Sequence, residues 1–321
     1  MRISIPRHRI RFALFAAALI ALIFAAVPTT LAQEKDEEPD FESKWPEPEH
    51  KLISFWNIGP NLKPDEWTEF RPPHYMVGVK SWKEFIEKNI EPEYKWGCRR
   101  WILHNPFGDY TGPMHFDQAV LARKFGFDYL LDDFVEAWTD FKKRHPDAQV
   151  IAYLGKLRGN KQFAPLAPEK PGSFEPRDPA QWIERMYKSI ELPLKAGMDI
   201  GMDASGNADK GSPTHAVMVL LRSLGVKVYA EAIPPKGQDH MKPFGVVTAW
   251  RFYDRPGRWD RSIRPEKFKG EFIILANGNL GSNRALDKDP KALKKMIEKI
   301  QNLGLTPAVP VRVLLGKDAK S

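Results

Sequence analysis

The segment from Asp199 to Glu231 reads DIGMDASGNADKGSPTHAVMVLLRSLGVKVYAE, and it decides the fold. A short apolar run, Asp199 to Asp203, comes before a helical stretch that Ser212-Pro213 opens and Gly225 closes. Serine can cap a helix, proline suits the first helical position, and glycine suits the left-handed position after the last turn. A second apolar run, Lys227 to Glu231, follows at once, so the segment predicts a strand, a helix and a parallel strand.

The same junction from helix to strand occurs twice more along the chain. Asp178-Pro179 opens a helical pattern that ends at Gly197, and Asp289-Pro290 opens one that ends at Gly304. Short Val, Ile and Leu-rich runs bounded by turn residues can be counted as eight: Leu52 to Ile58, Arg99 to His104, Gln149 to Leu154, Asp199 to Asp203, Lys227 to Glu231, Val246 to Arg251, Glu271 to Ala276 and Thr306 to Val309. Several are apolar on both faces, as parallel strands covered by helices are. We expect a single (β/α)8 barrel of the TIM type, with a doubly wound open sheet as the alternative.

Three connections are less regular. Phe116 to His145 carries a long helical pattern interrupted at Gly126, which predicts two helices or one kinked helix. Pro234 to Gly245 has no apolar period and is expected to lack a proper helix. The proline-rich, aromatic piece from Pro60 to Tyr75 is expected to form a long loop at the rim of the barrel.

The N-terminus is typical of an export signal. Four arginines precede an unbroken apolar run from Phe12 to Val27, and small residues follow up to Ala32, so residues 1–32 are expected to be a signal peptide that is removed. An uncleaved membrane anchor is the alternative. Residues 33–50 carry eight acidic side chains and few aliphatic ones, which predicts a disordered linker. The barrel domain is therefore expected over residues 51–321, in a secreted or periplasmic protein.

Charge and cysteine content narrow the class of protein. The whole chain carries a formal net charge of +8, and without the signal and the acidic linker the remainder carries +10. There is no Lys/Arg run and no nucleic-acid motif, so we expect a basic surface and no nucleic-acid partner. The single cysteine, Cys98, excludes an internal disulfide, and stability must come from the apolar core.

In a parallel barrel, the residues at the carboxyl ends of all strands converge on one mouth. Read in order, these ends offer two acids, Asp203 and Glu231, and a set of amides, aromatics and cations: Trp56, Asn57, His104, Asn105, Tyr153, Trp250, Arg251 and Asn277. Amides and charged groups bind hydroxyls, and aromatic faces cover the apolar side of a sugar ring. We expect this second set to bind a carbohydrate, with Trp56 and Trp250 as the aromatic platforms.

Glycoside cleavage needs one carboxyl group to protonate the leaving oxygen and a second to act as nucleophile or as base for water. Carboxyl groups on neighbouring strand ends can meet the short separation of a retaining enzyme, since strands lie about 4.8 Å apart. On this interpretation Asp203 is the nucleophile, and Glu231 is the acid/base, kept partly protonated by a neighbouring negative charge and apolar surroundings.

The segments AGMDIGMDASG (196–206) and VKVYAEAIP (226–234) resemble the α-amylase superfamily of (β/α)8 glycoside hydrolases, which has Asp after strand four and Glu after strand five. The resemblance covers these two short motifs and implies the same roles for Asp203 and Glu231. It departs at Gly201, where the superfamily has arginine, and at Asn277-Gly278-Asn279, which replaces its His-Asp pair. Asp254 offers another partner for Asp203, similar to the strand-six acid of α-galactosidase-like barrels.

Other functions stay open at this point. The eight histidines show no metal-ligand spacing, no GxSxG elbow is present, and no cofactor fingerprint is found, so we expect no metal and no cofactor. A non-catalytic carbohydrate- or envelope-binding barrel would keep the aromatics and amides without a correctly spaced acid pair. A phosphate-using lyase or isomerase would need Arg251 and the loop from Asn277 to Asn283 to bind an anion. A structural envelope protein held by an uncleaved N-terminal helix is the third alternative.

Overall fold

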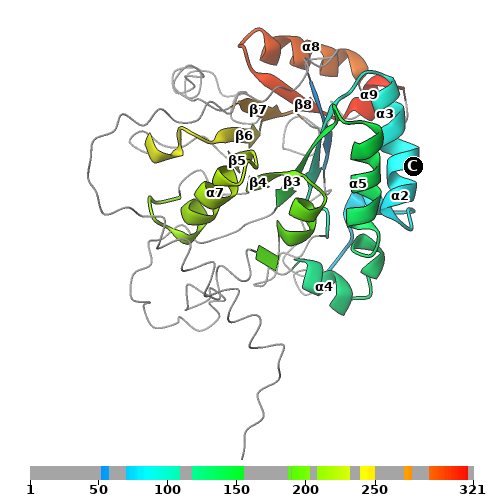
Figure 1. Ribbon diagram of the computed structural model, residues 1–321. Helices are drawn as coiled ribbons and strands as arrows, with labels where there is room; N and C mark the ends of the chain where they lie inside the picture. The colour runs from blue at the N-terminus through cyan, green and yellow to red at the C-terminus, as the bar shows by residue number, and fades with distance from the viewer. Residues whose placement is uncertain are drawn as a thin grey trace, which may run out of the picture. The chain divides into compact units, whose positions relative to one another are not determined.

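The structure is a computed structural model that describes residues 52–57, 70–108, 118–154, 187–188, 190–202, 208–231, 239–249, 271–276 and 289–316. Eight strands form one closed barrel in chain order, and every strand runs parallel to both neighbours (Figure 1). The strands are β1 (Ile53–Trp56), β2 (Arg100–His104), β3 (Gln149–Leu154), β4 (Asp199–Met202), β5 (Val228–Glu231), β6 (Gly245–Ala249), β7 (Phe272–Leu275) and β8 (Thr306–Val309). This confirms the (β/α)8 expectation over the open sheet. The predicted signal peptide (1–32) and linker (33–50) lie outside the described residues.

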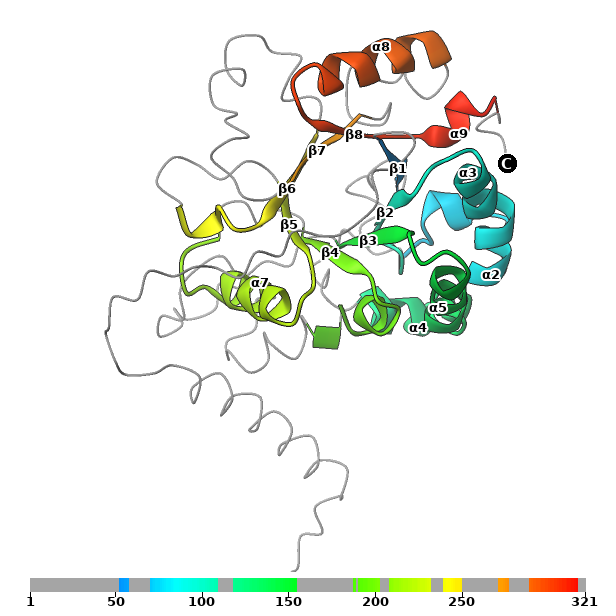
Figure 2. The same ribbon diagram turned by 45° about the horizontal axis from the view of Figure 1, so that its top comes forward.

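Helices surround the ring of strands, as the view along the barrel in Figure 2 shows. The α-helices are α2 (Trp82–Phe85), α3 (Glu91–Lys95), α4 (Gln118–Lys124), α5 (Phe134–Arg144), α7 (Pro213–Ser223), α8 (Pro290–Gln301) and α9 (Val311–Leu314). Shorter helical turns are η2 (His74–Met76), η3 (Ile86–Ile90), η5 (Asp128–Leu130) and η6 (Asp239–Met241), of which η3 is a π-helical turn that joins α2 to α3. Residues 190–195 are also helical.

The caps of α7 and α8 confirm the two helix signals that lie within the described residues. Ser212 Oγ accepts a hydrogen bond from the backbone N–H of His215 at 3.2 Å. Asp289 Oδ1 accepts from two backbone N–H groups at the start of α8, at 2.9 and 3.1 Å. Gly225 and Gly304 follow these helices with φ of +80° and +71°, a conformation in which other residues would be strained. Local sequence therefore determines where both helices begin and end.

The less regular connections partly match their predictions. The pattern from 116 to 145 forms two helices, α4 and α5, with Gly126 between them at φ +77°. Between β5 and β6 the structure describes residues 239–244, which contain the short turn η6, while residues 234–238 of the connection lie outside the described part. Of the expected rim loop, Pro60 to Tyr75, residues 60–69 lie outside the described part of the chain.

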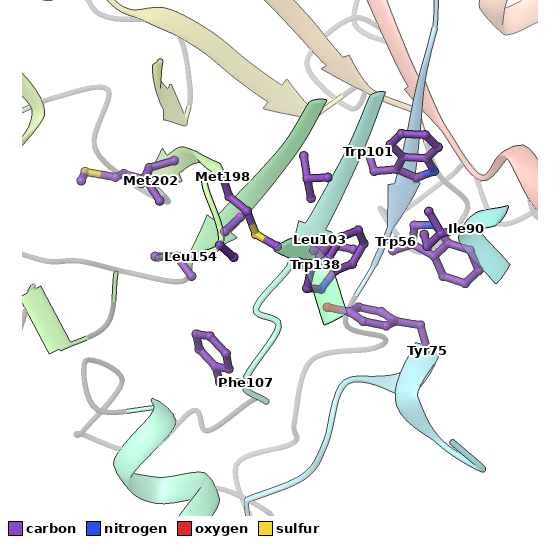
Figure 3. Packing of buried hydrophobic residues seen from close by; sticks show 14 of the residues in the cluster. Trp56, Tyr75, Ile90, Trp101, Leu103, Phe107, Trp138, Leu154, Met198 and Met202 are labelled. Atoms are coloured by element: carbon purple, nitrogen blue, oxygen red, sulfur yellow. The ribbon is translucent and has the colours of Figure 1, made fainter. Parts of the chain in front are cut away.

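Alternation along each strand divides the apolar side chains into two cores. Ten side chains pack inside the barrel: Ile53, Phe55, Ile102, Ile151, Tyr153, Tyr229, Val247, Ile273, Leu275 and Ala308. The outward-facing residues of the same strands, such as Trp101 and Leu103, pack against the helices in a larger second core (Figure 3). Burial on both faces explains why the strands appear in the sequence as continuous apolar runs.

The N-terminal end of the barrel contains a network of charged and polar side chains. Arg100 makes a two-pronged ion pair with Glu271, which also accepts from Thr306 Oγ1 at 2.7 Å and from Tyr229 Oη at 3.3 Å. Arg100 Nε donates to Gln149 Oε1 at 2.7 Å. Burial would raise the pKa of Glu271, but the adjacent guanidinium and the hydrogen bonds hold it below its usual value. The network joins strands β2, β3, β5, β7 and β8 below the inner apolar core.

Candidate functional site

Six of the ten predicted site residues lie in the described part of the chain: Trp56, Asn57, His104, Asn105, Tyr153 and Glu231. Asp203, Trp250, Arg251 and Asn277 lie outside it, as does the alternative acid Asp254. The six follow or end strands β1, β2, β3 and β5 at the carboxyl edge of the barrel. Three of them, Asn57, His104 and Glu231, are half-buried, while Trp56, Asn105 and Tyr153 are buried.

Asn57 and His104 are in direct contact. His104 ends β2 and alternates with the inward-facing Ile102, so its ring lies on the inner side of the strand. Its Nδ1 lies 3.0 Å from Asn57 Oδ1, across the β1–β2 pair. Phe55, the last apolar residue of β1 inside the barrel, stacks on the imidazole with ring centroids 6.1 Å apart and planes 23° apart. The mouth therefore begins where this apolar layer ends.

Tyr153 lies beside His104, with ring centroids 5.0 Å apart. It is only 2% exposed and belongs to the inner apolar core. Its ring occupies the space next to Gly201 on β4, where an added Cβ would lie 2.7 Å from Tyr153 Cδ2. Gly201 is thus required by the close approach of this ring, and the strand-four arginine of the α-amylase superfamily could not be placed there without moving Tyr153. Because Tyr153 is buried, it lines the interior of the barrel and offers little surface to a sugar.

Glu231 is the last residue of β5, and its neighbours define its direction. Tyr229, two residues earlier, packs in the inner core, and Ala230 packs in the outer one. Because alternate residues of a strand share a face, the side chain of Glu231 starts on the inner side of the barrel. It is half-buried at the carboxyl end, whereas Glu271 lies at the opposite end of the barrel. A solvent-accessible acid at this end is consistent with the predicted catalytic position.

Trp56 does not lie at the mouth. Its side chain is 5% exposed and belongs to the core between strands and helices, beside Trp101 and Ile90 (Figure 3). The indole Nε1 donates to Glu93 Oε2 at 3.3 Å, and the ring meets Phe85 edge to face with centroids 5.0 Å apart. The sequence interpretation placed both Trp56 and Asn57 at the mouth, but the two side chains point to opposite sides of β1.

Asn105 shapes the turn that leaves β2. Its φ of +47° is in the left-handed region, which asparagine adopts more readily than most residues. Its backbone N–H donates to Tyr153 O at 2.8 Å, and its carbonyl accepts from Gly108 N at 3.0 Å. Tyr75 supports the same turn, because its hydroxyl donates to the carbonyl of His104 at 3.2 Å. These contacts fix the backbone from which His104 projects.

Sequence reasoning missed the supporting residues Phe55, Tyr75 and Gly201. Gly201 could have been found, since a glycine inside a strand signals a bulge or a close approach of another group. Tyr75 lies in a segment without periodicity, and nothing in the sequence indicates that it reaches the end of β2.

Glu93 on α3 is a buried acid that the sequence interpretation also missed. It is 1% exposed, and Trp101 Nε1 donates to its Oε2 at 2.8 Å. Burial raises the pKa of Glu93 to about 7, against the lowering effects of Ser54, the two tryptophans and Arg312. Because Glu93 lies in the outer core and is closed to solvent, it does not belong to the mouth.

Within the described ranges, no three His, Cys, Asp or Glu side chains come together in a way that could hold a metal ion. In the same ranges, none of the helices combines the length and the apolar character that a membrane span requires. The sequence matches no protein-family model and no curated protein. The chemistry of the mouth is therefore what indicates a function.

Proposed function

We propose that this chain is a glycoside hydrolase in which Glu231 serves as the acid/base and Asp203 as the nucleophile. The observation that carries the proposal is the place of Glu231, a half-buried acid on the inner side of β5 at the carboxyl end of the barrel. Enzymes with this fold have their active sites at that end. Met202, the last described residue of β4, pairs with Ala230 of β5, and Asp203 and Glu231 are the next residues in the sequence.

The other groups at the mouth suit a substrate rich in hydroxyls. The Asn57 amide has donors and an acceptor, and the His104 imidazole can donate or accept a hydrogen bond according to its protonation. Glu231 would protonate the glycosidic oxygen as the bond to the leaving group breaks, while Asp203 would attack the anomeric carbon from the opposite face. In the second half of the reaction, Glu231 would take a proton from the water that releases the sugar.

Two variants and two kinds of substrate test these roles. Aryl glycosides with a dinitrophenolate leaving group need no protonation, whereas glycosides with an alkyl leaving group do. Glu231→Gln should therefore lose about 10²- to 10⁴-fold in kcat/KM on alkyl glycosides and much less on the activated ones. Asp203→Asn should lose turnover of both kinds, because it removes the nucleophile. Glu298→Gln, an exposed glutamate on α8, is the matched control and should behave as wild type.

Wild-type turnover by Glu231→Gln on alkyl glycosides would remove Glu231 from the mechanism. Sugar binding without turnover by the wild-type protein would instead favour the non-catalytic carbohydrate-binding barrel. As part of the proposal, residues 1–32 direct export and are removed. The mass of the N-terminal peptide of exported protein tests this, because a peptide that still begins at Met1 contradicts cleavage and favours the anchored form.

A further inference from the structure

The contact between Asn57 and His104 determines where the imidazole carries its proton. Asn57 Oδ1 lies 3.0 Å from His104 Nδ1. A carbonyl oxygen can only accept a hydrogen bond, so the nitrogen that faces it must donate. In the neutral ring the proton is then on Nδ1, and Nε2 carries the lone pair. This is the less common form of a histidine side chain in water, and it needs a partner to hold it.

The surroundings of His104 restrict the ring to this orientation. Phe55 covers one side at a centroid distance of 6.1 Å, and Tyr153 lies at 5.0 Å on the side of β3. The backbone is held by the hydroxyl of Tyr75, which donates to the carbonyl of His104 at 3.2 Å. Rotation of the imidazole by half a turn would replace Nδ1 with a carbon opposite Asn57 and lose the hydrogen bond. The flanking rings therefore hold the plane of the imidazole, and the contact with Asn57 favours the orientation in which Nδ1 faces the amide.

The position of the pair indicates more than a role in packing. Both side chains are half-buried, while the inner-core residues before them in the strands, Phe55 and Ile102, are closed to solvent. Packing alone would not distinguish the two tautomers of a histidine. Here the amide faces Nδ1, which is the nitrogen nearer to the backbone, so the lone pair of the neutral ring is on the nitrogen farther along the side chain.

We infer that Asn57 is a positioning residue, which holds His104 as the Nδ1–H tautomer so that Nε2 accepts a hydrogen bond from a substrate hydroxyl at the mouth. The tautomer follows from the orientation of the Asn57 amide, whose Oδ1 faces the ring, whereas the role toward a hydroxyl rests on the proposed function. Asn57 was expected to bind the sugar directly. In this role it acts through His104 instead.

Two substitutions at Asn57 separate this role from simple packing. Asn57→Asp keeps an acceptor opposite Nδ1 and adds a negative charge, so it should keep the Nδ1–H tautomer and raise the pKa of His104. Asn57→Leu keeps a similar volume but has no acceptor, so the Nε2–H tautomer should become the major neutral form. Asn302→Asp, on an exposed residue after α8, controls for the added charge and should change neither property.

Two-bond ¹H–¹⁵N correlation spectra of histidine report the tautomer directly, and the His104 signals are identified by their loss in His104→Gln. We expect wild type and Asn57→Asp to show a protonated Nδ1 above the pKa of the ring. A protonated Nε2 in the neutral wild-type ring would overturn the inference, and so would an unchanged tautomer in folded Asn57→Leu. If Asn57→Leu does not fold, the wild-type and Asn57→Asp spectra still decide the question.

Kinetics test the second half of the inference once a substrate is known. Loss of one hydrogen bond to a hydroxyl should raise KM about tenfold in Asn57→Leu. Asn57→Asp should lose activity at a pH where wild type is active, because its imidazole stays protonated and Nε2 cannot accept. If the spectra are as expected but no glycoside is turned over, the proposed function is rejected and the tautomer assignment is kept. If glycosides are turned over but the neutral ring of His104 is protonated on Nε2, the tautomer assignment is rejected and the proposed function is kept.

Discussion

Replacing Glu93 by glutamine should make the protein more stable at alkaline pH and change its stability little at acid pH. Glu93 is 1% exposed, and its Oε2 accepts from both Trp56 Nε1 and Trp101 Nε1. Its other oxygen, Oε1, and Ser54 Oγ are buried without a hydrogen bond of ordinary geometry among the described residues. Glutamine has the same shape, can accept from both indoles through its carbonyl oxygen, and carries no charge at any pH.

The size of the effect follows from the pKa of Glu93, which burial raises from 4.5 to about 7. Between these values the folded protein holds one proton more than the unfolded chain, so stability falls as pH rises through this window. A difference of about 2.5 pKa units corresponds to about 3 kcal/mol at 1.36 kcal/mol per unit. The loss begins above the unfolded pKa and is complete above the folded one. Glu93→Gln does not titrate and escapes this loss.

Urea unfolding of both proteins at several pH values from 5 to 8 measures the difference. The free energy of unfolding of Glu93→Gln, relative to wild type, should increase by about 2 to 3 kcal/mol over this range. Glu84→Gln is the control, because the hydrogen bond from Lys88 lowers the pKa of Glu84 below its ordinary 4.5. Glu84 is then ionised in both states above pH 5, and the difference between Glu84→Gln and wild type should stay constant from pH 5 to 8. A difference between Glu93→Gln and wild type that stays constant from pH 5 to 8 would refute the reasoning.

Three further substitutions test other parts of the fold. Gly245→Ala would place a Cβ 2.4 Å from Tyr229 Cδ1, so it should destabilise the protein by about 1 to 3 kcal/mol in urea unfolding. Unchanged stability would mean that the Tyr229 ring can move aside freely. Glu271→Gln removes the charge that pairs with Arg100 and should cost up to about 3 kcal/mol, and an equally stable variant would contradict the importance of this pair. Asp289→Ala removes the cap of α8 and should cost about 1 kcal/mol in thermal unfolding, with Asp289→Asn keeping most of the stability.

The sequence predicted the architecture well because the signals were local and repeated. All eight strands fall within the apolar runs or within one residue of them. Ser212 and Asp289 cap the helices whose starts they were expected to mark. Caps and strand composition depend on the backbone of a few neighbouring residues, so a single sequence carries them.

The candidate site was predicted only in part, because its details depend on the side of the strand to which each side chain points and on contacts between residues far apart in the sequence. Trp56 was expected at the mouth with Asn57, but consecutive residues of a strand face opposite sides, and the side was not assigned. The contact between Asn57 and His104 was not expected, since it spans 47 positions of the sequence. Glu93 was missed because the sequence does not indicate that Trp56, 37 positions away, and Trp101, 8 positions away, both bind its carboxylate.

The ion pair between Arg100 and Glu271 also has a consequence for how the barrel assembles. These residues are 171 positions apart, on β2 and next to the start of β7. A ribosome makes the arginine long before the glutamate, so a nascent chain that contains only the first six strands lacks the carboxylate that pairs with this guanidinium. Completion of the ring needs β7 and β8, which lie within the last sixth of the polypeptide, so a truncation that removes them would leave the barrel open.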